Sequence, residues 1–158
     1  MAELFQRIPY DSLNSRQQEA FNFQKVSAVL ADYGFITIRL SNDWGGADFI
    51  AQHADGQTFL KVQLKSRLTF QKQYLDRDLH ICFPHGGEWY IYPHDVLLRE
   101  IVSTGRVGTT DSWTKAKGEF SFRHLSREVR KLLEPYRLDA TEARGIETGK
   151  ESELVPES

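Results

Sequence analysis

Residues 46–66 read GADFIAQHADGQTFLKVQLKS, two runs of alternating apolar and polar residues separated by a turn at residues 54–57. Such alternation is typical of β-strands, and the Asp-Gly pair in the turn tolerates the positive φ values that a tight hairpin needs. Antiparallel pairing brings the start of the first strand to the end of the second, so Asp48 should lie beside Gln63 and Lys65. The stretch therefore predicts a hairpin with a carboxylate, an amide and an ammonium group at one edge.

The two faces of the second strand differ in polarity. Residues two apart in a strand point the same way, so Gln63 and Lys65 share one face, and Val62 and Leu64 share the other. The apolar face is expected to pack against a helix. A hairpin with one wet polar face would show the same alternation, so by pattern alone a purely structural explanation stands beside a functional one.

The groups at the polar edge suit phosphate chemistry. Mg²⁺ prefers oxygen ligands, which the Asp48 carboxylate, the Gln63 side-chain oxygen and the Leu64 backbone carbonyl could supply. Such an ion polarises a phosphodiester and lowers the pKa of bound water. The Lys65 ammonium could orient that water or stabilise charge that develops on the phosphate. The edge is therefore a candidate site for phosphodiester hydrolysis with Mg²⁺ or Mn²⁺.

A helix is predicted over residues 14–33, with Asn14 at its cap and Gly34 after its end. Apolar residues recur at helical spacing, and these are Phe23, Val26, Leu30 and Tyr33. Glu19 lies one turn before this stripe, at its edge, where it could face the site; a solvent-exposed surface Glu is the alternative.

Further strands are predicted on both sides of the hairpin. Residues 35–40 should form one strand, and a polar loop then leads to Asp48. Residues 78–83 and 88–93 predict two more strands around a turn at residues 84–87, and a helix is predicted over residues 94–104.

This order of elements resembles the PD-(D/E)XK nuclease superfamily, the restriction-endonuclease-like fold that includes Holliday junction resolvases. The segments that carry the resemblance are residues 33–39, 46–51 and 59–66. In that family the aspartate and the acid of the (D/E)XK element bind metal, the lysine assists hydrolysis, and an acid on the first helix often completes the site. The resemblance implies these roles for Asp48, Gln63, Lys65 and Glu19.

The chain departs from the family pattern in its acidic positions. Gln63 stands where Asp or Glu is usual, which makes the motif a QXK variant with one negative charge fewer and predicts weaker metal binding. Ala47 replaces the proline, a common and mild change. Asn22 and Phe23 lie nearer than Glu19 to the usual distance of the helix acid before Gly34. A decayed enzyme is therefore an alternative to an active one.

Composition bounds the domain organisation. A chain of 158 residues with 40% hydrophobic content can build one compact core. Residues 139–158 hold six acidic and two basic residues, a net charge of −4, which leaves +2 for residues 1–138. We expect one nuclease-like domain over residues 1–138 and an acidic, disordered tail over residues 139–158. The chain has no apolar run of membrane-span length and no secretory signal pattern, which predicts a cytoplasmic protein.

Basic residues near the hairpin are candidate contacts to nucleic-acid phosphates, and these are Lys61, Arg67, Lys72 and Arg77. A second basic group is placed on a late helix, with scattered solvated cations as the alternative, and it comprises Arg123, Arg127, Arg130 and Lys131. Cys82 is expected to be a buried inert thiol, and Trp113 an anchor for a long connection. The five histidines lack zinc-ligand spacing, so none is assigned to metal.

Together these patterns predict an α/β (α+β) fold with a restriction-endonuclease-like core, in which helices flank a central mixed sheet of four or five strands. The expected function is metal-dependent hydrolysis of DNA, with RNA as the alternative substrate and a homodimer as the form that cuts both strands. Two other interpretations stay open. One is a nuclease fold without turnover that binds nucleic acid or a protein, and the other is a small interaction domain with no nucleic-acid partner.

Overall fold

The computed structural model describes residues 2–42, 45–105, 111–114 and 118–139. Its α-helices are α1 (Ser15–Asp32), α2 (His94–Ser103), α3 (Asp111–Thr114) and α4 (Arg127–Leu133). Its strands are β1 (Phe35–Arg39), β2 (Phe49–His53), β3 (Phe59–Leu64), β4 (Thr69–Gln71), β5 (Leu79–His85), β6 (Glu88–Pro93), β7 (Glu119–Ser121) and β8 (Arg137–Leu138). Short 3₁₀ turns are η1 (Ala2–Phe5), η2 (Tyr10–Ser12), η3 (Lys72–Tyr74) and η4 (Glu134–Tyr136).

Helix α1 begins with a capping box. The backbone N–H of Gln17 donates to the Asn14 side chain at 2.9 Å, and the Asn14 N–H donates to the Gln17 side chain at 3.0 Å. Gly34, with φ +81°, turns the chain into β1. The predicted helix is confirmed, with one correction to its stripe: Tyr33 is exposed, and its hydroxyl donates to the Asp139 carbonyl at 2.9 Å.

The central sheet has the order β1-β2-β3-β5-β6-β8. Strands β3 and β5 are parallel, and the other neighbours are antiparallel. The predicted mixed sheet flanked by helices is confirmed, but it has six strands, one more than the upper expectation. The extra strand is β8, which pairs with Trp89 and Tyr90 and is held by the Arg137–Glu88 ion pair at 3.3 Å.

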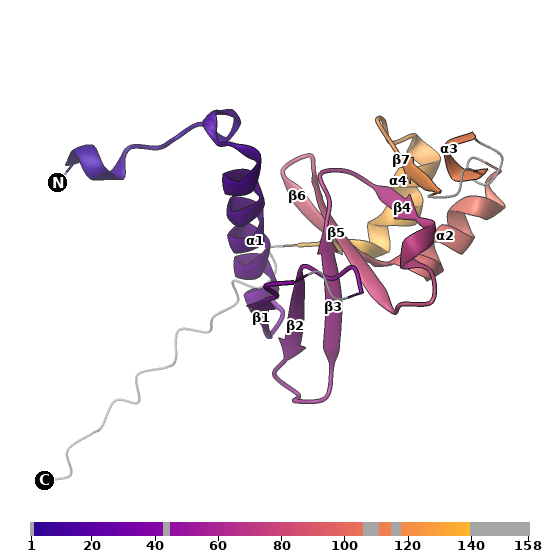
Figure 1. Cartoon of the computed structure of the whole chain (residues 1–158), viewed down its shortest axis with the longest axis horizontal. Coiled ribbons are helices and arrows are strands. Elements are labelled where there is room, and N and C mark those ends of the chain that lie inside the picture. The colour runs from indigo at the N-terminus through magenta and orange to yellow at the C-terminus, as the bar shows by residue number, and fades with distance from the viewer. Residues whose placement is uncertain (1, 43–44, 106–110, 115–117, 140–158) are drawn as a thin grey trace, which may run out of the picture.

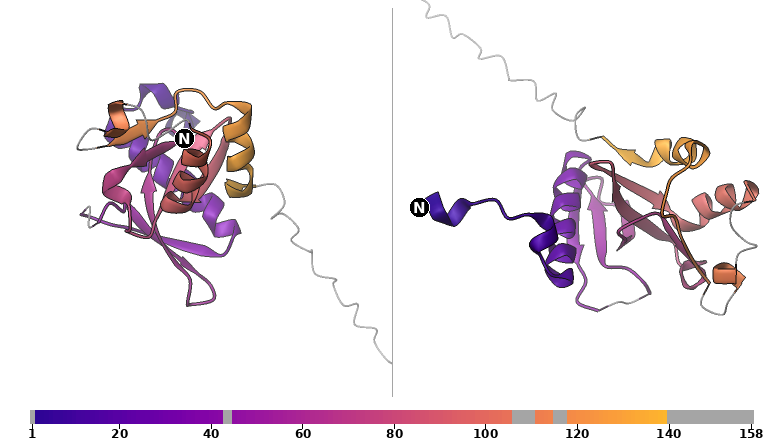
Figure 2. Two further views of the ribbon diagram at one scale, coloured as in Figure 1. Left: turned by 90° about the vertical axis from the view of Figure 1, so that its right-hand side faces the viewer. Right: turned by 90° about the horizontal axis from the view of Figure 1, so that it is seen from above.

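Each face of the sheet carries its own core. Under α1, Val26 and Leu30 pack on the central strands, on a cluster that includes Phe49, Val62 and Cys82. On the opposite face, α2, α4 and the small β4–β7 sheet cover the β5–β6 half, and their cluster includes Phe70, Ile81, Tyr92, Leu97 and Val129. Figure 1 and Figure 2 show α1 and this second layer on opposite sides of the sheet. Cys82 is buried as predicted, which raises the pKa of its thiol.

Two local predictions were wrong, and two short strands were not predicted. Pro84 and His85 were expected in a turn, but they continue β5, and the turn consists of Gly86 and Gly87. Arg123 was expected on the late helix, but it precedes α4. Strands β4 and β7 were not predicted, because three-residue strands carry too little alternation to be recognised.

Other predictions concern the ends of the chain and its long connection. Trp113 is partly buried against the second core, as the anchor prediction requires. Residues 140–158, where most of the tail was predicted, lie outside the described residues. Among the helices of the described residues, none combines the length and the apolar character needed to cross a membrane.

Candidate functional site

Asp48 lies one residue before β2 and is fixed by its neighbours on both sides. Its N–H donates to the Val62 carbonyl at 2.8 Å, and its carbonyl accepts from the Leu40 N–H at 2.9 Å. Its side-chain Oδ2 accepts from the Leu64 N–H at 2.7 Å. The sequence placed Asp48 within the strand, whereas it precedes β2 and still stands against the end of β3.

Gln63 and Lys65 extend from the end of β3 on the side away from α1. Gln63 pairs in register with Ile81 of the second core, while Val62 and Leu64 pack toward α1. The Gln63 Nε2 donates to the Leu64 carbonyl at 3.4 Å. Its Oε1 is buried and has no hydrogen-bond partner among the described residues.

Lys65 lies over an aromatic ring that the sequence analysis did not assign to the site. Its Nζ is 5.5 Å from the ring centroid of Tyr74, a cation–π distance, and its backbone N–H donates to the Cys82 carbonyl at 2.9 Å. Gly46, with φ +89°, lies so close to Tyr74 that an added Cβ would be 3.0 Å from Cε1. The Tyr74 ring therefore links the Asp48 segment to the Lys65 ammonium.

Tyr74 is supported in turn by a buried histidine. The N–H of Gln71 donates to the Nε2 of His94 at 3.1 Å, and the other ring nitrogen, Nδ1, donates to Asp95 at 2.8 Å. Asp95 also accepts from the Asp76 N–H at 2.9 Å. Burial lowers the pKa of His94. The neighbouring Asp95 carboxylate acts in the opposite direction, but the effect of burial is larger. These bonds hold both ends of the segment that carries Tyr74.

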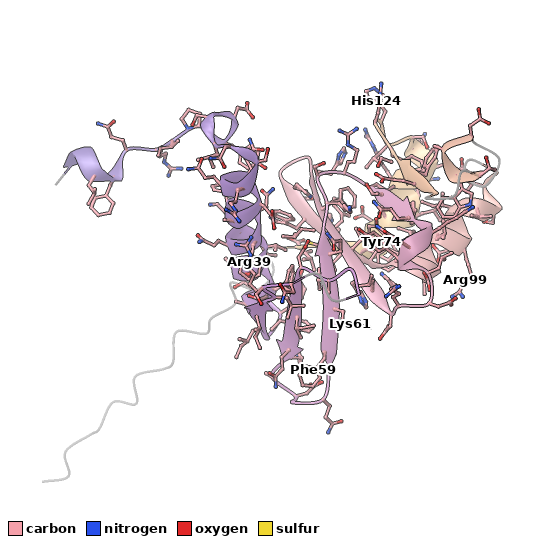
Figure 3. All side chains as sticks on the ribbon, viewed as in Figure 1. Arg39, Phe59, Lys61, Tyr74, Arg99 and His124 are labelled. Atoms are coloured by element: carbon pink, nitrogen blue, oxygen red, sulfur yellow. The ribbon has the colours of Figure 1, made fainter. Side chains whose placement is uncertain are left out.

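Glu19 and Asp48 line one open cavity of about 620 Å³, together with Arg16, Ala20, Arg39, Leu40 and Ser41. Glu19 and Arg39 form an ion pair at 3.1 Å. Asn22 points elsewhere, because its Nδ2 donates to the Tyr10 hydroxyl at 2.9 Å. Gln63 and Lys65 do not line this cavity. Asp48 therefore connects two groups of residues, the cavity residues around Glu19 and the end of β3 that carries Gln63 and Lys65. Figure 3 places Arg39 beside α1 and Tyr74 on the other side of β3.

The donor set fits a hard divalent cation in its chemistry. Asp48 offers a carboxylate, Gln63 a buried amide oxygen without a hydrogen-bond partner in the described structure, and Leu64 a backbone carbonyl. Glu19 could add a second carboxylate, although it pairs with Arg39. No group of three or more His, Cys, Asp and Glu side chains suited to metal occurs within the described ranges. A group of three acidic ligands with Asp48 and Glu19 would need Asp or Glu at position 63, where this chain has Gln63.

The four predicted phosphate contacts do not form one surface. Lys61 and Arg77 adjoin each other, since the Lys61 ammonium donates to the Arg77 carbonyl, and they line a cavity of about 480 Å³. Arg77 also lines a cavity of about 210 Å³ with Tyr74 and Gly46. Lys72 instead lies over the Trp113 ring at 5.5 Å, and Arg67 borders a separate cavity.

Tyr74, His94 and Arg39 also belong to this region, although they were not predicted from the sequence to do so. Tyr74 and His94 reach it through contacts between residues far apart in the chain, for which a single sequence gives no signal. The sequence did give a weak signal for Arg39. It is the last residue of its strand, at the end that leads into the loop before Asp48.

Comparison with solved structures found a similarity to a known protein. The fold is similar to that of Hjc, a Holliday junction resolvase from Archaeoglobus fulgidus, with a TM-score of 0.41 and 13% sequence identity. The match covers 77% of this chain and 99% of the resolvase chain. No protein-family model and no curated protein matches the sequence.

Proposed function

We propose that this protein is a metal-dependent nuclease of the cytoplasm that hydrolyses phosphodiester bonds in DNA. The observation that carries the proposal is the bond from the Leu64 N–H to Asp48, which brings the carboxylate of one strand to the QLK segment of the next. The motif, its order along the chain and the cavity beside Asp48 all agree with the resemblance of residues 46–66 to the PD-(D/E)XK pattern.

In this proposal Asp48, Gln63 Oε1 and the Leu64 carbonyl would hold Mg²⁺ or Mn²⁺, and Glu19 would complete the site from the cavity that it shares with Asp48. A cation held there would lower the pKa of a coordinated water and polarise the phosphodiester. The Lys65 ammonium lies over the Tyr74 ring. From there it would orient the attacking water and stabilise negative charge on the phosphate. Arg39, paired with Glu19, sets the position of that carboxylate and adds positive charge for the nucleic-acid strand.

A second candidate function is a nuclease fold without turnover that binds nucleic acid or a protein. Gln63 favours it, because a neutral ligand in place of a carboxylate weakens the attraction for a divalent cation. The Glu19–Arg39 ion pair favours it as well, since a carboxylate held by a guanidinium is less available to metal.

Cutting both strands of a duplex calls for two copies of the site, so we propose a homodimer. Support comes from the sheet face turned away from α1, where Ile36, Ile38 and Phe59 are 71%, 52% and 53% exposed. Ile36 and Ile38 lie on β1, at the edge of the sheet, and Phe59 lies on β3, with β2 between the two strands. An exposed apolar surface of this kind is one that a second copy could cover.

The decisive experiment is cleavage of linear, nicked, branched and single-stranded DNA, and of single-stranded RNA, with Mg²⁺ or Mn²⁺. Wild type is compared with Asp48→Ala and Lys65→Ala. The chain offers matched controls in Asp32→Ala and Lys25→Ala, because the Lys25 ammonium also lies over an aromatic ring, Phe21, at 5.2 Å.

We expect metal-dependent cleavage that falls by at least about 100-fold in both site variants, as for loss of a group that stabilises transition-state charge, and that persists in both controls. Equal loss in site and control variants would assign the effect to folding. If folded wild type cuts none of the substrates with either metal, the result favours the nuclease fold without turnover.

A further inference from the structure

A small cavity separate from the proposed metal site carries two arginines and a histidine at its rim. Its volume is about 250 Å³, and three segments that are distant in the chain build it. Arg67 follows β3, His85 ends β5, and Arg123 follows β7. Figure 3 labels His124, the residue after Arg123, at the outer end of this region.

The floor of this cavity is part of the second core. Leu68 and Phe83 are each only 1% exposed, and the Phe122 N–H donates to the Leu68 carbonyl at 2.9 Å. Phe122 also packs edge-on against Phe70 at 6.3 Å. Because buried residues and a backbone hydrogen bond hold its floor, the backbone segments that carry the three side chains are fixed before any ligand binds.

The positive charge at the rim is not neutralised by carboxylates of the described residues. Neither Arg67 nor Arg123 forms an ion pair with an acid within the described ranges, and the cavity lining contains no Asp or Glu. Glu88, the residue opposite His85 in the hairpin, is bound by Arg137 at 3.3 and 3.4 Å. An anion that enters the cavity would therefore meet donors without competing for them.

We propose that this cavity binds a phosphodiester group of a nucleic-acid strand, through Arg67 and Arg123, with His85 and the Ser66 hydroxyl as additional hydrogen-bonding groups. Guanidinium groups match the geometry of phosphate oxygens and are suited to bidentate contacts. The inference extends the proposed function, because it names a second contact of the same substrate.

The cavity lies within reach of the neighbouring nucleotides of that strand. Two residues of extended chain span at most about 7 Å, which bounds the backbone separation of Lys65 and Arg67. Successive nucleotides of a duplex strand rise by about 3.4 Å, so the phosphate bound here is expected within a few nucleotides of the one that is cut. The contact would thus fix which nucleotide of the bound nucleic-acid strand lies at Lys65.

The test measures binding of a labelled DNA duplex and a labelled single strand as a function of salt, without added metal. All variants are made in an Asp48→Asn chain, so that cleavage plays no part in the readout. The double variant Arg67→Gln/Arg123→Gln is compared with Arg7→Gln/Arg99→Gln, which removes the same charge outside the cavity. Arg67→Lys/Arg123→Lys keeps the charge but loses the planar guanidinium groups, and melting temperatures show whether each variant is folded.

We expect the cavity double variant to bind at least about 10-fold more weakly and to lower the slope of log affinity against log salt by about 1, as loss of one phosphate contact predicts. The lysine variant should recover the slope but only part of the affinity. The control should keep the slope of the parent chain.

Three results would overturn the inference: no binding of either DNA by the parent chain at low salt, a cavity variant that matches the control, or a loss of binding explained by unfolding. The proposed nuclease is judged separately, by cleavage with wild-type Asp48. A chain that binds through this cavity but never cuts DNA refutes the nuclease and keeps the inference. If wild type cuts DNA but the cavity variant binds DNA as tightly as its parent, the nuclease is supported and the inference is refuted.

Discussion

The backbone N–H of Leu64 donates a hydrogen bond of 2.7 Å to the Oδ2 of Asp48. This contact joins two strands at the point where the carboxylate and the lysine of the motif must meet. It also gives Asp48 a structural role in addition to any chemical one, so the two must be separated by choice of substitution.

Asp48→Asn should abolish cleavage while leaving the fold nearly intact, because the amide oxygen can still accept the Leu64 N–H although it carries no charge for a metal. Asp48→Ala leaves that N–H without its acceptor and should cost about 1–3 kcal/mol of unfolding free energy. Urea denaturation and cleavage assays on both variants check this, with Asp32→Asn on α1 as the control. A large loss of stability in Asp48→Asn would contradict it.

Gln63→Glu should make stability depend on metal. A second carboxylate close to Asp48 is partly buried and of like charge, so without metal the variant should be less stable than wild type by about 1–3 kcal/mol. Mg²⁺ should reverse most of that loss and bind more tightly than in wild type. Thermal melting with and without Mg²⁺ measures both effects. Equal metal response in the two proteins would argue against Gln63 as a ligand.

Gly46→Ala should impair the site more than a matched glycine substitution elsewhere. Both Gly46 and Gly87 have positive φ, +89° and +79°, but a Cβ at Gly46 would press on Tyr74 at 3.0 Å, whereas a Cβ at Gly87 meets nothing within 4 Å. We expect Gly87→Ala to cost about 1 kcal/mol through its backbone alone, and Gly46→Ala to cost more. Cleavage should fall only in Gly46→Ala, because Tyr74 supports Lys65. Similar losses in the two variants would contradict this.

Fold stability should decrease below about pH 6.5, since the buried His94 and the half-buried His80 both favour the neutral form in the folded chain. Burial lowers the pKa of His94 against Asp95, and that of His80 against Asp78. Their pKa values are lower in the folded chain than in the unfolded one, whose ordinary value is 6.5. The stabilisation is therefore complete above that pH and is lost progressively as the pH falls through the folded values.

Urea denaturation at a series of pH values tests this linkage in wild type, His80→Gln, His94→Gln and the double variant. The quantity compared is the change in unfolding free energy with pH, not its absolute value, because His94 is also a structural hydrogen-bonding residue. Each single variant should lose part of the dependence below about pH 6.5. A double variant with the wild-type dependence would show that other groups cause it.

Ile36→Lys/Ile38→Lys should convert the proposed dimer to a monomer with little change in monomer stability, because both side chains are exposed in the single chain. Sedimentation over a range of protein concentrations measures the effect. Val96→Lys/Val102→Lys, at exposed apolar positions on α2, is the matched control and should leave association unchanged. A wild-type protein that stays monomeric at all concentrations would exclude this mode of association.

The elements that the sequence predicted correctly depend on signals between near neighbours in the chain. The cap at Asn14, the glycine at position 34 and the alternation in residues 46–66 each act over a few residues, and the structure contains α1, β1, β2 and β3 at the expected places. The pairing of Asp48 with the end of β3 also follows from local chemistry, because a short hairpin leaves few registers open.

The sequence alone therefore determined the helix, the hairpin and the meeting of Asp48 with the QLK segment. Only the tertiary structure decided that Tyr74 lies under Lys65, that Glu19 and not Asn22 shares a cavity with Asp48, and that Arg67, His85 and Arg123 surround one pocket. These neighbours are set by how two cores pack on opposite faces of the sheet. Packing depends on contacts between residues tens of positions apart, which no local periodicity encodes.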